Sequence, residues 1–216
     1  MKNTMIIIIV ICGFYTCKAQ SPILDLHDND LYFGDVNNAY YKDIEGFYNQ
    51  FVGTWVYTSG NTMLKVKFKK KDMFYQTPPP VAFYIDYLIG EFQYIENGVE
   101  KANTLSNLDI NHTDISDYNI VSLGKVDLTG FPKCNDCPAG TVRISMMFDE
   151  PANDDVTLLG AFVMRKVVEN GVEKIKVQFQ MLELANNVNK ANWDLPSTAR
   201  KHTIPYGDYT LVKVEE

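Results

Sequence analysis

The stretch Phe51-Val52-Gly53-Thr54-Trp55 decides the fold of this chain. It follows a segment, residues 38–51, in which aromatic and aliphatic side chains recur at spacings of three and four, and this spacing predicts one short helix. Beyond it, apolar side chains alternate with lysines from Leu64 to Lys69, which predicts a β-strand with one buried and one solvated face. A short helix that leads into alternating strands indicates the start of a small up-and-down β-barrel.

Alternation of the same kind recurs at residues 142–149 and 175–181. The hexapeptide Glu-Asn-Gly-Val-Glu-Lys occurs at 96–101 and again at 169–174, and its Asn-Gly pair supplies the two positive φ angles of a type I′ hairpin turn. Counting the runs predicts roughly eight to ten strands. We therefore expect an all-β chain with a single antiparallel up-and-down barrel over residues 51–216, preceded by a segment, residues 20–50, that carries the short helix.

Two details of this barrel follow from local composition. Apolar positions change parity at Gly90, between Ile85 and Tyr94, so we expect a β-bulge at that glycine. The segment 103–117 is polar and rich in asparagine, which predicts a long surface loop.

The N-terminus carries the features of an export signal. Lys2 precedes an apolar run from Met5 to Phe14, and a small-residue cleavage site ends at Ala19, so residues 1–19 are expected to be a signal peptide. The run is too short to cross a bilayer as a helix, and no later stretch is longer, so we expect no transmembrane segment. Two routes stay open: release of a soluble chain into the periplasm or medium, or lipidation of Cys17 as an envelope anchor.

Charge and cysteine content agree with export. The formal net charge is −7, and loss of Lys2 and Lys18 with the signal peptide makes it −9, which argues against nucleic acid as a partner. Cys134 and Cys137 would have only each other after export, and an oxidising compartment would join them in a disulfide. A structural clamp on a loop, a labile redox pair and half of a metal site are the three interpretations of this Cys-x-x-Cys.

The opening stretch resembles the first strand of the calycin superfamily, the lipocalins and fatty-acid-binding proteins, whose Gly-x-Trp signature closes one end of the barrel. The resemblance implies a lipocalin-like barrel in which Trp55 packs across the base and is structural. The arginine of the fatty-acid carboxylate clamp has no counterpart near the chain end, where Tyr209 to Lys213 stands.

A longer resemblance runs over nearly the whole mature chain, to a family of exported proteins of Gram-negative bacteria that is catalogued only as a domain of unknown function. Its marks in this sequence are Lys18-Ala19-Gln20, the Phe51 to Trp55 opening, Leu88-Ile89-Gly90-Glu91, the first Glu-Asn-Gly-Val-Glu-Lys hairpin and Cys134-Asn135-Asp136-Cys137. This resemblance implies export and the fold, and it implies no reaction.

Motifs for catalysis or cofactor binding are absent from the sequence. It holds no Gly-x-Ser-x-Gly, no His-Glu-x-x-His and no phosphate-binding glycine loop, so we expect no enzyme and no cofactor. The three histidines, His27, His112 and His202, stand apart among polar or loop residues, which is typical of solvated side chains, and we expect no metal site.

The interior of the barrel determines the expected function. Thirteen tyrosines and twelve phenylalanines either fill a small barrel or line its cavity. We expect non-catalytic binding of a small apolar or amphipathic molecule, with a structural or protein-interaction module with a filled core, acting through loops such as 77–80 and 103–117, as the alternative. The ligand-lining candidates are the inward-facing residues Val66, Phe68, Phe92, Phe148 and Phe179.

Overall fold

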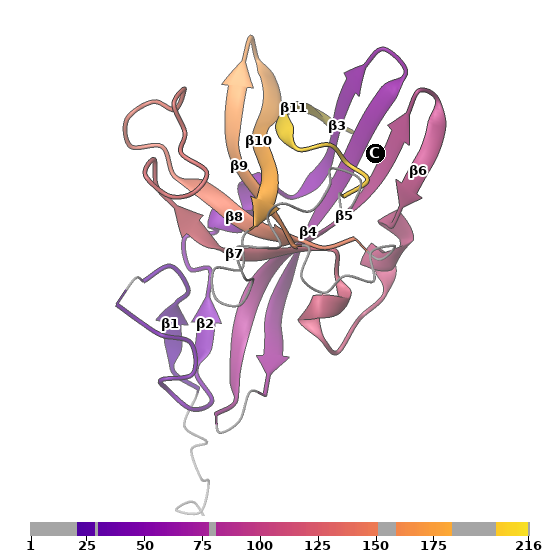
Figure 1. Ribbon diagram of the computed structural model, residues 1–216. Helices are drawn as coiled ribbons and strands as arrows, with labels where there is room; N and C mark the ends of the chain where they lie inside the picture. Colours follow the sequence, from indigo (N-terminus) through magenta and orange to yellow (C-terminus); the bar gives the residue numbers. More distant parts are fainter. Residues whose placement is uncertain (1–20, 29, 78–80, 151–158, 183–201, 216) are drawn as a thin grey trace, which may run out of the picture.

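Figure 1 shows a computed structural model that describes residues 21–28, 30–77, 81–150, 159–182 and 202–215. Within these ranges no helix has the length and apolar character needed to span a membrane. The signal peptide predicted at 1–19, with Cys17, lies outside the described residues, as does most of the loop 77–80.

The elements in chain order are β1 Ile23–Asp25, β2 Tyr40–Lys42, the 3₁₀ turn η1 Phe47–Gln50, β3 Gly53–Ser59, β4 Thr62–Gln76, β5 Phe83–Glu96, β6 Val99–Asn103, the 3₁₀ turns η2 Leu105–Asp109 and η3 Ile115–Asp117, β7 Ile120–Val126, β8 Arg143–Phe148, β9 Leu159–Glu169, β10 Val172–Leu182 and β11 Gly207–Val214.

Eight of the described strands form a closed antiparallel barrel, which confirms the predicted fold class. Strands β3, β4, β5, β7, β8, β9, β10 and β11 follow one another around it in chain order. The barrel closes where β11 pairs with β3 and where β5 pairs with β7, the latter only through Ile89 with Val121 and Gly90 with Ile120. β6 continues from β5 as a side hairpin (Figure 1).

The two Asn-Gly turns have the predicted conformation. Asn97 and Gly98 have φ of 52° and 79°, and Asn170 and Gly171 have φ of 54° and 77°. The flanking residues pair directly across each turn, so both hairpins have two-residue loops of the type that suits the twist of antiparallel strands.

The helix predicted between residues 38 and 51 is wrong. Tyr40–Lys42 is instead the strand β2, which runs parallel to both β1 and β5. Gly46 then takes a left-handed conformation with φ of 68°, and only the single turn η1 follows. The carboxylate of Asp43 accepts hydrogen bonds from the backbone N–H groups of Phe47 and Tyr48, at 2.8 and 3.0 Å, and so fixes where this turn begins. Strand pairing has overridden a helical spacing of apolar residues.

The bulge predicted at Gly90 is also wrong. The register between β4 and β5 runs without interruption past Phe68 and Gly90, and it shifts instead between Lys71 and Phe74 on β4, where Met73 has a φ of 51°. A Cβ on Gly90 would lie 2.6 Å from Cδ1 of Phe68, so the glycine is there to admit an aromatic ring.

The expected surface loop at 103–117 contains η2 and η3, which cover the outer face of β5. Ile89, Leu108, Tyr118 and Val121 form a small second core beneath them. Ile89 therefore faces outward from the barrel yet is only 2% exposed. Both faces of this part of β5 are buried.

Candidate functional site

The five predicted lining residues lie together inside the barrel, and none is more than 2% exposed. The ring centroids of Phe92 and Phe148 are 4.9 Å apart, and those of Phe148 and Phe179 are 4.8 Å apart. A Cβ on Gly160 would lie 2.6 Å from Cε2 of Phe179, so rings press against the barrel wall as well as against each other. Three pockets among the described residues, of about 160, 260 and 250 Å³, are each lined by other side chains. That the five predicted residues contact a ligand stays a prediction.

Trp55 is fully buried at 0% exposure. Its indole N–H donates a 2.7 Å hydrogen bond to the carbonyl of Phe51, and Lys213 places its ammonium 5.6 Å from the centroid of the Trp55 ring system. These contacts tie the Phe51 to Trp55 opening to the last strand. They fit the structural role implied for Trp55, and its closure of the barrel base stays a prediction.

A pocket lies beside the barrel, at the point where β5 and β7 separate after their two residue pairs. The N-terminal segment, residues 26–28 and 30–33, packs between the two strands there. We call it the fork pocket, and its volume is about 260 Å³. Its apolar wall comes from the N-terminal segment and from the two strands. The residues of this wall include Leu26, Leu31, Phe33, Ile85 and Leu123, and the polar residues include His27, Tyr48, Asp86, Ser122 and Lys125. A pocket with apolar walls and a few convergent polar groups is the usual form of a small-molecule site.

His27 and Asp43 form a buried pair at the wall of the fork pocket. His27 Nε2 lies 3.1 Å from Asp43 Oδ1, and the two side chains are 4% and 0% exposed. The pKa of His27 lies below its ordinary value because burial disfavours the cation and nearby Lys125 repels it, although Asp43 acts in the opposite direction. A neutral imidazole in this position donates its Nε2 proton to the carboxylate.

Two buried carboxylates, those of Asp43 and Asp86, share one lysine. Lys70 Nζ lies 3.7 Å from Asp43 Oδ2 and 3.3 Å from Asp86 Oδ2. Asp86 also accepts a 2.6 Å hydrogen bond from the hydroxyl of Tyr40 and a 3.0 Å bond from the N–H of Met73, at the β4 bulge. The carboxylate oxygens of Asp43 and Asp86 already have these partners. We therefore infer that the two carboxylates fix the structure at the base of the pocket and do not act as an acid–base pair.

Ser122 and Lys125, both on β7, line the side of the fork pocket opposite the N-terminal segment. The Ser122 hydroxyl accepts a 3.1 Å hydrogen bond from the N–H of Leu88, which spans the gap where the two strands part. The same hydroxyl bonds Tyr48, whose pKa is raised chiefly by burial. Lys125 lies 4.6 Å above the centroid of the Phe47 ring and 3.5 Å from an exposed carboxylate oxygen of Glu45, so its ammonium is held at the pocket.

The expectation that all three histidines are solvated is wrong. The side chain of His27 is buried in the fork, His202 is only 4% exposed as a residue, and the His112 side chain is 18% exposed and bonds Asn107. His202 lies against Phe148 and Phe179 at ring-centroid distances of 5.1 and 5.5 Å, so it takes part in the aromatic filling of the barrel. Sequence spacing carried no signal for the contacts of His27 and His202, because they join separate segments of the chain.

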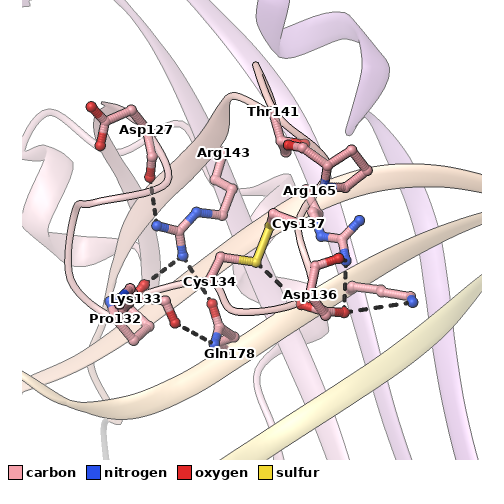
Figure 2. Close-up of a disulfide and its surroundings, with 12 residues drawn as sticks. Asp127, Pro132, Lys133, Cys134, Asp136, Cys137, Thr141, Arg143, Arg165 and Gln178 are labelled. Atoms are coloured by element: carbon pink, nitrogen blue, oxygen red, sulfur yellow. Dashed lines mark hydrogen bonds and ion pairs between the residues drawn. A yellow bond between two sulfur atoms is a disulfide. The ribbon is translucent and has the colours of Figure 1, made fainter.

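The disulfide between Cys134 and Cys137 is confirmed (Figure 2). It lies in a loop that covers the outer face of β8, and this loop buries Arg143, a residue that alternation alone places toward solvent. Arg143 is 1% exposed, and its guanidinium donates to the carbonyls of Asp127, Gly130 and Pro132 and to the side-chain carbonyl of Gln178, at 2.6–2.9 Å. The sulfurs of the two cysteines and a carboxylate oxygen of Asp136 lie within 4.8 Å of one another, but sulfurs joined in a disulfide are not metal ligands.

Comparison with known proteins gives a family without a reaction. A family model described as a family of unknown function, DUF6705, matches residues 1–214. This chain belongs to that family. No curated protein and no solved structure matches the chain.

Proposed function

We propose that this protein binds a small amphipathic molecule without catalysis, and that the ligand lies in the fork pocket and not inside the barrel. One observation carries the proposal. Aromatic rings in contact with one another occupy the interior positions, whereas the fork pocket has an open volume of about 260 Å³ bounded by both apolar and polar side chains. Lys125 and neutral His27 supply a cation and an imidazole for the polar end of a ligand, and Leu26, Leu31 and Phe33 supply the apolar wall.

The first experiment measures the mass of the protein purified from the cells that make it, under native and then denaturing conditions. We expect a native excess that disappears on denaturation. Two substitutions locate the bound molecule: Leu31→Trp fills the fork pocket, and Leu105→Trp is the matched control because it fills a separate pocket of about 250 Å³ on the outer face of the barrel. The excess should be absent from the first variant and present in the second. Native and denatured masses that agree with the bare chain would contradict the proposal.

A second candidate function is a protein-interaction module with a filled core. It is favoured by apolar side chains exposed at the rim of the fork pocket, where Phe33 and Leu123 are 50% and 49% exposed and Tyr32, next to Phe33, is 76% exposed. Two results would favour this candidate. The native mass in the first experiment would equal that of the chain without a ligand, and one protein would co-purify with the natural chain but not with the Phe33→Ser variant.

We also propose that the chain is exported. The support is the apolar run Met5 to Phe14 after Lys2, together with a disulfide of the kind that persists in oxidising compartments. The mass of the mature N-terminal peptide tests it. A chain that begins at Gln20 indicates release, a diacylated Cys17 indicates a lipid anchor, and an intact Met1 would contradict export.

A further inference from the structure

We propose that the Cys134–Cys137 pair is a site of thiol–disulfide exchange, in which Cys137 is the sulfur that is attacked and Cys134 is the leaving thiolate. This site is separate from the fork pocket and does not depend on the function proposed there. Figure 2 shows its parts: the disulfide, the carboxylate of Asp136, and two arginines that hold the loop from β8 and β9.

The loop keeps its shape through bonds other than the disulfide. Arg143, on β8, binds three backbone carbonyls between Asp127 and Pro132, and Arg165, on β9, donates a 2.8 Å hydrogen bond to Asp136 Oδ2. The disulfide itself spans a sequence separation of only 3, and a cross-link that closes so short a loop removes the least entropy from the unfolded chain. Reduction should therefore leave both sulfurs close together, as reversible exchange requires.

The two cysteines differ in exposure. Cys137 is half-buried, whereas Cys134 is 8% exposed and lines a pocket of about 160 Å³. The same pocket is lined by Arg165 and Lys176. An incoming thiol meets Cys137, the more exposed of the two cysteines, and the thiolate that leaves is generated in a pocket that holds two cations, Arg165 and Lys176, together with the carboxylates of Asp136 and Asp208.

Asp136 tunes the leaving sulfur. Its Oδ1 lies 3.2 Å from Cys134 Sγ, and Lys176 Nζ lies 3.9 Å from its Oδ2. In the disulfide this sulfur carries no proton, so the contact is not a hydrogen bond. In the dithiol the Cys134 thiol donates to that oxygen, and the carboxylate takes part in moving its proton.

The exchange conserves atoms and electrons. The thiolate of a partner dithiol attacks Cys137 Sγ, the Cys134–Cys137 bond breaks, and Cys134 leaves as a thiolate that takes up a proton. The second thiolate of the partner then attacks the partner's own sulfur in the mixed disulfide, which releases Cys137 as a thiolate. The partner is oxidised by two electrons to a disulfide, and this protein is reduced to the dithiol, which a small-molecule disulfide reoxidises.

The experiment follows reduction of the folded protein by excess reduced glutathione at pH 7, with trapping of free thiols by alkylation and detection by mass. We expect both cysteines to become alkylated while the circular dichroism of the fold is unchanged. Reduction that occurs only in denaturant would overturn the proposal, since that is the behaviour of a buried structural clamp.

Charge variants give a second readout. Asp136→Asn removes a negative charge next to Cys134 and should speed reduction. Arg165→Gln removes the nearer cation of that charge, leaves it with Lys176 at 3.9 Å, and should slow reduction. Each effect should be about threefold for every unit of change in the pKa of the leaving thiol. Asp30→Asn, the same change at an exposed position outside this pocket, is the control and should leave the rate unchanged. Equal rates in all three variants, or changes of the same sign in the first two, would overturn the proposal.

Single-cysteine variants assign the roles. With Cys134→Ser, the accessible Cys137 should form a mixed disulfide with oxidised glutathione at least tenfold faster than Cys134 does in Cys137→Ser. The reverse order would overturn the assignment of Cys137 as the attacked sulfur.

Discussion

Gly160, on β9, shows how tightly the barrel interior is filled. A Cβ there would lie 2.6 Å from Cε2 of Phe179 and 3.1 Å from Cβ of Phe148, and both phenylalanines are 0% exposed. Gly160→Ala should lower the free energy of unfolding by about 1–3 kcal/mol, because the rings must move off their preferred rotamers. Urea unfolding measures this. Val168→Ala is the control on the same strand, since Val168 is 63% exposed and its loss should cost less than about 0.5 kcal/mol. Equal costs at the two positions would indicate unfilled space near Gly160.

Glu91 is a buried carboxyl that should make stability depend on pH. Its Oε1 accepts hydrogen bonds from Asn107 Nδ2 and from the N–H of Asn119, at 2.8 and 3.1 Å, whereas its Oε2 is buried with no hydrogen-bond partner. Burial raises the pKa of Glu91 above its ordinary value. Below the unfolded pKa both states hold the proton, and as the pH rises through the folded pKa the unfolding free energy falls because only the native carboxylate is desolvated.

Glu91→Gln removes that ionisation. The variant should therefore be more stable than the natural chain at pH 8, and the difference should shrink toward pH 4.5. Urea unfolding at several pH values measures it, with Glu96→Gln, at a side chain that is 43% exposed, as the control. A difference that does not change with pH would contradict the assignment.

At the scale of elements, the pairing of β5 with β7 is the weakest seam of the barrel. Only two residue pairs join these strands, whereas β9 and β10 pair along their whole length. Amide hydrogen exchange should be at least tenfold faster at Val121 than at Phe162 on β9. Strands joined by few backbone hydrogen bonds separate more readily, and their amides are then exposed to solvent. Ser122→Ala should further speed exchange of the Leu88 amide, which donates to that hydroxyl, and should leave β9 unchanged. Uniform exchange around the barrel would contradict a weak seam.

Elements also show what the sequence can and cannot predict. Alternation from Leu64 to Phe68 and the Asn-Gly turns were sufficient for the barrel, because a strand with one buried face and a two-residue turn are local features. The helix expected before β3 failed because β2 pairs with strands distant in sequence, and an apolar spacing cannot report such pairing. The burial of Arg143 and His27 was missed for the same reason. Each is buried by a loop or segment that packs across a strand, and the residues next to it in the sequence do not indicate that packing.

At the scale of the whole molecule, we expect a ligand bound in the fork pocket to stabilise the folded protein by mass action. An amphipathic dye, 1-anilinonaphthalene-8-sulfonate, should raise the unfolding free energy by roughly 2.7 kcal/mol at a hundredfold excess over its dissociation constant. Leu31→Trp should remove this gain and Leu105→Trp should keep it. An equal gain in both variants would place the dye elsewhere on the molecule.

The most direct test of the fork pocket is a titration of the isotopically labelled full chain with the same dye, followed by the shifts of backbone amide resonances. We predict that the largest changes fall on residues 26–28, 31, 33 and 122–125, which line the fork pocket. Largest changes at Val66, Phe92, Phe148 and Phe179 would mean that the ligand enters the barrel, and would contradict the account of a solid interior with its binding site outside.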